Sequence, residues 1–207
     1  MKNLTSSLVL LAALGFVACK GHSKTIVVYA NGNIQVDATQ TNITNGEGTS
    51  QHEQTLSYNN GDPVTLNVTT ISGKLTLQAP DDGLYIANLK QNDTIIGSFQ
   101  RVGDDNGGEK ISQDALKIKL DSLQKLVANQ NISAANKNYY ILPNTIAKIS
   151  GESKAKAFGP YTTIPGAFDA GSVPEIYKFY SIREIREIIT NLNKMTGETK
   201  PAAEQKK

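Results

Sequence analysis

The chain has little of what most catalytic and metal sites are built from. Among its 207 residues there is one cysteine, Cys19, and no tryptophan. A lone thiol cannot form an intramolecular disulfide or the thiolate cluster of a structural zinc site. The two histidines, His22 and His52, are too few for a multi-histidine metal site, and neither sits in a pattern typical of a serine-type triad. Stability therefore has to come from a packed core, which a chain of this length can supply.

Long apolar runs are also missing. The run Leu8–Val17 covers about ten residues, roughly half of what a helix needs to cross a bilayer. Lys2 precedes this run, and the small residue Ala18 follows it. This order is typical of a signal peptide. An ordinary signal-peptidase site needs small residues at −3 and −1, and the positions around Cys19 fit that rule poorly.

The segment Phe16-Val17-Ala18-Cys19 resembles the lipobox of bacterial lipoproteins, in which lipid is added to the cysteine before cleavage on its N-terminal side. Phe16 replaces the usual Leu, and looser boxes of this kind occur in lipoproteins of Bacteroidota-type bacteria. The resemblance covers the signal peptide and lipobox alone. It implies removal of residues 1–18 and anchoring through Cys19; the alternative is a secreted protein with a chance cysteine.

The residues that follow the cysteine bear on localisation. Residues 19–24 form a short tether that has no acidic cluster, whereas surface-exported Bacteroidota lipoproteins resemble one another in having one. By that resemblance we expect the protein at the periplasmic face of the outer membrane. Lys20 and Lys24 are expected to contact lipid head groups, each contributing ~1 kcal/mol of attraction near an anionic surface.

The charge balance argues against a nucleic-acid partner. Cleavage before Cys19 removes Lys2 from the 21 basic residues and leaves 20 against 19 acidic ones. No basic stripe with interleaved aromatic residues is present. We therefore expect the membrane, through the lipid anchor, as the first partner, and another envelope protein or a glycan as a possible second one.

Residues 25–103 show the pattern of short strands. Val64, Leu66 and Val68 alternate with polar residues, which predicts a strand with one buried face. Asn31-Gly32 lies between two strand candidates and predicts a type I′ hairpin. About seven strands at 8 to 12-residue spacing favour an antiparallel β-sandwich or meander.

Residues 104–196 change to a mixed pattern. Leu116, Leu120, Leu123 and Val127 predict a helix, and short strands are expected on both sides of a turn at Pro143-Asn144. Ser181 and Glu184 form a capping box at the start of a strongly amphipathic helix. Its apolar face is expected to pack on the protein's own sheet, with a partner helix as the alternative. Residues 197–207 are polar and expected to be disordered. The fold class expected for the whole chain is α+β.

Aromatic residues are concentrated late in the chain. Of the twelve that remain after cleavage, eight lie between positions 139 and 180. Tyr161, Phe168, Tyr177 and Tyr180 are the candidates for a ligand surface that binds a glycan, a peptide or an envelope protein. The other interpretation, favoured for most of these rings, is the core of a C-terminal module. The absence of tryptophan weakens the prediction of sugar stacking.

Acidic residues give weak signals for a metal site or for catalysis. Asp104, Asp105 and Glu109 supply oxygen ligands of the kind Ca²⁺ prefers, but their spacing is not that of an EF-hand, and an ordinary turn explains them better. No cofactor is expected. Hydrolysis by dispersed acids, such as Asp82, Asp169 or Glu175, is the competing function.

One tripeptide, Asp93-Thr94-Ile95, resembles the Asp-Ser/Thr-apolar motif of O-glycosylated Bacteroidota periplasmic proteins, which makes Thr94 a candidate glycosylation site. The sequence as a whole favours a non-catalytic envelope lipoprotein that acts as a binding or structural module. The alternatives are a periplasmic hydrolase or carbohydrate-active enzyme, and a protein attached to peptidoglycan through its Lys-ended tail.

Overall fold

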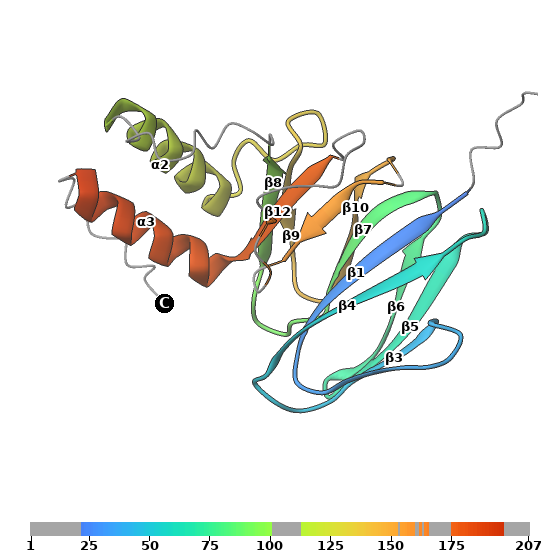
Figure 1. Ribbon diagram of the computed structural model, residues 1–207. Helices are drawn as coiled ribbons and strands as arrows, with labels where there is room; N and C mark the ends of the chain where they lie inside the picture. Colours follow the sequence, from blue (N-terminus) through green and yellow to red (C-terminus); the bar gives the residue numbers. More distant parts are fainter. Residues whose placement is uncertain are drawn as a thin grey trace, which may run out of the picture.

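The computed structural model describes residues 22–100, 113–152, 154–159, 162, 164–165 and 175–196. Within these ranges the chain is an α+β protein, as expected, with twelve strands and two helices (Figure 1). The strands form three four-stranded sheets, which we call sheets A, B and C.

The elements are bounded as follows. Sheet A has the order β10 (Thr145–Ser150), β7 (Gly83–Asn88), β1 (Lys24–Asn31) and β4 (Gln51–Tyr58). Sheet B has the order β2 (Ile34–Val36), β3 (Asn42–Asn45), β5 (Val64–Thr70) and β6 (Gly73–Ala79). Sheet C has the order β11 (Lys156–Phe158), β12 (Ile176–Ser181), β8 (Ile95–Gln100) and β9 (Asn138–Ile141). The helices are α2 (Gln113–Val127) and α3 (Ile182–Thr196).

The strand spacing suggested antiparallel pairing throughout residues 25–103, but all three sheets are mixed. Each contains one parallel pair: β1 with β7, β3 with β5, and β11 with β12. The reason in the first two sheets is that the chain moves back and forth between sheets A and B. A strand that returns to its sheet after such a crossing can run in the same direction as the strand it joins.

The core is divided into three layers by these sheets. Ile26 and Val28 of sheet A pack against Leu66 and other residues of sheet B. The opposite face of sheet A packs against sheet C, and the outer face of sheet C packs against α2 and α3. Sheet A is therefore covered on both faces. This explains why β1 and β7 carry nearly continuous apolar runs where an alternating pattern would mark a half-exposed strand.

Strands from both expected modules share sheets. β10 pairs with β7 in sheet A, and β8 pairs with β12 and β9 in sheet C. Residues on either side of position 103 therefore contribute to the same two sheets and to the core between them.

The prediction of a hairpin at Asn31-Gly32 is wrong, because β1 and β2 do not pair with each other. β1 pairs with β4 and β7, whereas β2 pairs with β3 in the other sheet. Gly32 has a φ of 90°, and its N–H donates to the carbonyl of Ser50 at 2.7 Å. A Cβ at this glycine would lie 2.3 Å from the carbonyl oxygen of Gly46. The glycine is thus needed where the chain crosses between two sheets, which a short-range turn signal does not distinguish from a hairpin.

Other local predictions are confirmed. β5 alternates buried and exposed residues and forms a hairpin with β6. At the start of α3 the Ser181 N–H donates to Glu184 Oε2 at 2.8 Å, and the Glu184 N–H donates to Ser181 Oγ at 3.2 Å, which completes the capping box. The apolar side of α3 packs on α2 and sheet C through Ile185, which is buried. In the part of the chain that the structure describes, no helix has both the length and the apolar character to cross a bilayer.

Candidate functional site

Several of the residues selected from the sequence lie outside the described residues. They are Cys19, Asp104, Asp105, Glu109, Tyr161, Phe168 and Asp169. The remaining candidates are Asp82, Thr94, Glu175, Tyr177 and Tyr180, and the structure places them at different positions around the fold.

The two described tyrosines of the candidate ligand surface differ in exposure. Tyr177 is 1% exposed and packs edge-on against Phe99 and Tyr139, with ring centroids 5.8 and 5.9 Å away. It belongs to the core between sheets A and C. Tyr180 is partly buried on the other face of β12, where the Lys178 ammonium lies 5.1 Å from its ring centroid. The core interpretation therefore holds for Tyr177, and Tyr180 has only part of its ring open to a ligand.

Glu175, one of the acids considered for hydrolysis, is bound by three side chains. Its Oε1 accepts a hydrogen bond from the Lys137 ammonium. Its Oε2 accepts from Ser150 Oγ at 2.6 Å and from the Tyr177 hydroxyl at 3.0 Å. Lys137 also lies over the ring of Phe99, 4.5 Å from its centroid. This Glu175 cluster joins the start of β12 to the end of β10 and to the segment that leads into β9.

Electrostatics keep this carboxylate ionised. Hydrogen bonds from Lys137 and then from Ser150 lower the pKa of Glu175 below its usual value of 4.5. Burial, followed by the bond to Glu175, raises the pKa of Tyr177 well above its usual range. An ionised carboxylate that already accepts three hydrogen bonds is a poor proton donor at neutral pH, so the geometry favours a structural role for Glu175.

Asp82 lies beside the start of β1. Its Oδ2 is 2.6 Å from Nδ1 of His22, and the two side chains are 35% and 69% exposed. Close by, Lys24 is completely buried and donates from Nζ to the carbonyl of Asp62 at 2.7 Å. The expectation that Lys24 contacts lipid head groups is therefore wrong, because its ammonium is used inside the fold.

Thr94 is held at the junction of β8 and α3. Its carbonyl accepts the Ile182 N–H at 2.9 Å, and its side chain is partly buried. The neighbouring Asp93 carboxylate pairs with the buried Lys90 at 2.8 Å. Thr94 remains a predicted glycosylation site, now placed on a fixed connection of the fold.

A second polar cluster, which the sequence did not predict, contains Glu53 of β4 and Lys178 of β12. Glu53 Oε2 accepts from Thr162 Oγ1 at 3.3 Å. The Lys178 ammonium donates to the carbonyls of Gly159 and Thr162 at 2.6 and 2.7 Å. Gly159 and Thr162, which follow β11, are thus held by the ammonium, and Thr162 also by the carboxylate. We call this the Glu53–Lys178 cluster.

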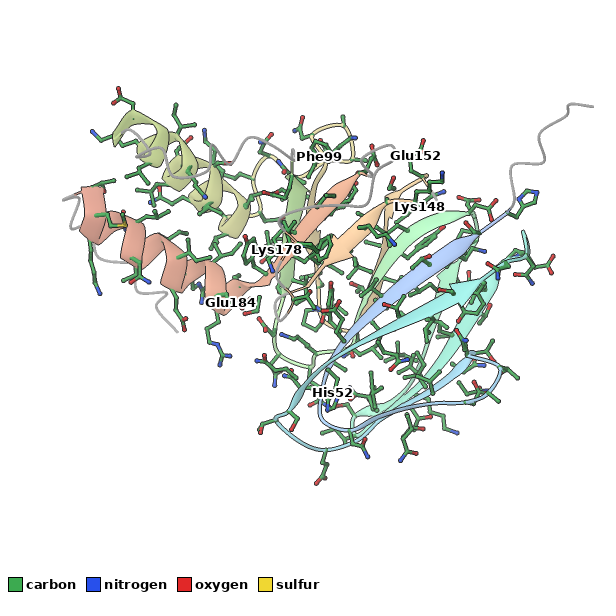
Figure 2. The ribbon with its side chains drawn as sticks, in the orientation of Figure 1. His52, Phe99, Lys148, Glu152, Lys178 and Glu184 are labelled. Atoms are coloured by element: carbon green, nitrogen blue, oxygen red, sulfur yellow. The ribbon has the colours of Figure 1, made fainter. Side chains whose placement is uncertain are left out.

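Space is tight in the Glu53–Lys178 cluster. A Cβ added at Gly159 would lie 2.2 Å from the ring of Tyr29 and 2.5 Å from Glu53 Oε2. Figure 2 shows Lys178 near the end of β12 that continues into α3, where Glu184 is labelled. Only a residue without a side chain fits at position 159, where the chain lies against the side chains of Tyr29 in β1 and Glu53 in β4.

Burial perturbs both charged groups of the cluster. It raises the pKa of Glu53, opposed by the Thr162 hydrogen bond and the charge of Lys178. It lowers the pKa of Lys178, opposed by the charges of Glu184 and Glu53. No sequence signal marked these residues, because Glu53 stands in a polar stretch and Lys178 in an ordinary strand. Strand pairing and the loop after β11 bring them together.

Other features of the described surface add little chemistry. No three His, Cys, Asp or Glu side chains in the described ranges come together as metal ligands would. An open hollow lies on α3, lined by Arg183, Arg186, Glu187, Thr190 and Asn191. It contains neither Glu53 nor Glu175.

Comparisons with known protein families, with curated proteins and with solved structures find no match to this chain.

Proposed function

We propose that the protein is a non-catalytic lipoprotein of the bacterial cell envelope, anchored through Cys19 at the periplasmic face of the outer membrane. Its folded part would act there as a binding or structural module toward another envelope protein or a glycan. The observation that carries the proposal is the lipobox-like segment ending at Cys19, five positions before β1 begins at Lys24.

The charge chemistry of the described residues supports a module without catalysis. Glu175 is saturated with hydrogen-bond donors, and Asp82 pairs with His22 near the surface. The ammonium of Lys178 donates hydrogen bonds to two backbone carbonyls. Groups engaged in this way stabilise loops and strand ends.

The first prediction concerns the anchor. The variant Cys19→Ala is expected to leave the membrane fraction and to lose labelling by a palmitate analogue, because it lacks the thiol that receives lipid. Fractionation of cells that express the full-length precursor measures both effects. Ser23→Ala, which keeps the thiol, serves as the control and should behave like the wild type. Labelling of Cys19→Ala by the palmitate analogue at the wild-type level would refute lipid anchoring through this residue.

A second candidate function is a periplasmic hydrolase or carbohydrate-active enzyme. The observation that favours it is the raised pKa of Glu53 beside Lys178, since such pairs serve in acid–base catalysis. The test is hydrolysis of purified cell-wall sacculi and chromogenic glycosides. Activity that is lost in Glu53→Gln and retained in Glu47→Gln, a change at an exposed position, would support the enzyme. We expect no activity in either variant or in the wild type. The free energy of unfolding of Glu53→Gln should be no lower than that of the wild type, because the amide oxygen still accepts from Thr162 and burial no longer penalises a charge.

A further inference from the structure

The chain is fixed in the fold almost from the first described residue. The carbonyl of Ser23 accepts the Gly83 N–H at 3.0 Å. Lys24 is paired with Tyr58 on one side and with Gly83 on the other. The first strand cannot detach to lengthen the tether without breaking its pairing with β4 and β7 and the hydrogen bond from the Lys24 ammonium to the Asp62 carbonyl.

Little chain remains between this fixed point and the proposed lipid. Cys19 and His22 are three residues apart, so their Cα atoms are separated by at most about 11 Å even in a fully extended chain. His22 is itself held to Asp82. The acylated cysteine must therefore lie close to the surface around the start of β1.

Three loops surround that start and form one end of the molecule, which we call the tether end: residues 59–63, 80–82 and 151–152. The first follows Tyr58, the partner of Lys24, and supplies the Asp62 carbonyl that Lys24 binds. The second contains Asp82, and the third lies against Gly83, where a Cβ would meet Ser150 and Gly151. The tether end is thus defined by contacts with the segment that carries the lipid.

The large exposed apolar residues in the described ranges lie elsewhere. They are Ile71, Leu142, Ile118 and Met195, which are 53–72% exposed. Ile71 follows the end of β5 and Leu142 the end of β9, both at the opposite end of the sheets, and the other two belong to α2 and α3. Figure 1 shows these helices on the far side of the molecule from the start of β1.

We infer that the tether end rests on the lipid head groups, and that the opposite end, with α2 and α3, is directed away from the bilayer toward any partner. The inference rests on the proposed lipid anchor. Charge favours no attachment to an anionic bilayer, because the tether end exposes Asp62, Asp81 and Glu152 against one exposed lysine, Lys154, and Lys148 is already paired with Asp81 at 3.2 Å. The short covalent anchor alone holds this surface against the membrane.

The lone native thiol makes the orientation measurable, because Cys19 is acylated and any introduced cysteine is then the only free one. The test compares Asn59→Cys, in an exposed loop of the tether end, with Ser72→Cys, in the exposed β5–β6 turn at the other end. Lipidated full-length protein is added to preformed vesicles of phosphatidylethanolamine and phosphatidylglycerol, so that every anchor inserts from outside. A bulky, impermeant maleimide then reports the labelling rate in vesicles and in detergent.

The expected result is several-fold slower labelling of Asn59→Cys in vesicles than in detergent, with no change for Ser72→Cys. Raising the salt concentration should leave the protection intact, and protection that disappears in salt would overturn attachment by the anchor alone. Equal labelling of both positions on vesicles that float with bound protein would overturn the orientation while leaving the anchor intact. Failure of the protein to float with vesicles would refute the anchor itself.

Discussion

Lys137, Ser150 and Tyr177 all donate hydrogen bonds to the carboxylate of Glu175, and they come from separate segments of the chain. A single acidic residue therefore ties together the ends of strands in two sheets. Because these donors lower the pKa of Glu175, the ionised form stabilises the folded state. This stabilisation is complete above the usual pKa of 4.5 and is lost as the pH falls through the lower pKa of the folded protein.

Replacement of this residue gives a prediction at the residue scale. Glu175→Gln is expected to lower the free energy of unfolding at pH 7 by about 1–2 kcal/mol, since it removes a charge from a partly exposed network. The loss should shrink at pH 3, below the usual pKa of 4.5, because the unfolded wild-type chain then takes up a proton at this carboxyl and the stabilisation from the ionised form decreases. Urea unfolding at both pH values measures the difference. Glu47→Gln, at an exposed position, is the control, and a loss of equal size at both pH values would contradict the role of the charge.

At the scale of elements, α3 shows how local signals and tertiary packing combine. The capping box fixes where the helix begins, and the apolar stripe fixes which face is buried. Of its apolar residues, however, only Ile185 is fully buried, while Met195 near the C-terminal end is 67% exposed. The helix is therefore anchored to sheet C and α2 mainly through its first turns.

The unequal burial along the apolar face of α3 predicts that substitutions there change the free energy of unfolding by different amounts. Ile185→Ala is expected to lower the free energy of unfolding by about 2–5 kcal/mol, because it opens a cavity between α3, α2 and sheet C. Met195→Ala should change it by no more than about 0.5 kcal/mol. Chemical denaturation of both variants provides the comparison. Similar losses at the two positions would mean that the distal part of the helix is buried against something else.

At the scale of the whole molecule, the central position of sheet A governs stability. One face packs on sheet B and the other on sheet C, and its edge strand β10 comes from residues 145–150. Residues 25–103 alone would leave β7 without this neighbour and would expose a face that carries Tyr29 and Ile86. Such a face is too apolar to remain in water as an independent module.

A fragment tests this dependence. Residues 22–103, expressed without the rest of the chain, are expected to aggregate or to unfold without a cooperative transition. The chain from residue 22 to residue 207 should unfold cooperatively under the same conditions and serves as the control. Thermal unfolding monitored by circular dichroism makes the measurement. A cooperative transition in the fragment would show that residues 22–103 form an independent domain.

The sequence by itself determined most features that depend on neighbours along the chain. The alternation in β5, the capping box of Ser181 and Glu184 and the apolar stripes of both helices are local patterns, and each appears in the fold where it was expected. The α+β class follows from the same patterns. The lipobox-like segment is a local signal as well, and it remains a prediction.

Only the tertiary structure decided which strands are neighbours. Asn31-Gly32 looks the same whether the chain makes a hairpin or crosses to another sheet, because the turn chemistry of a glycine does not encode its distant partners. For the same reason the sequence did not reveal the Glu53–Lys178 cluster, the burial of Lys24 or the three donors around Glu175. Apart from Tyr177 and Glu175, the groups that meet are far apart along the chain, and their burial is set by the packing that brings them together.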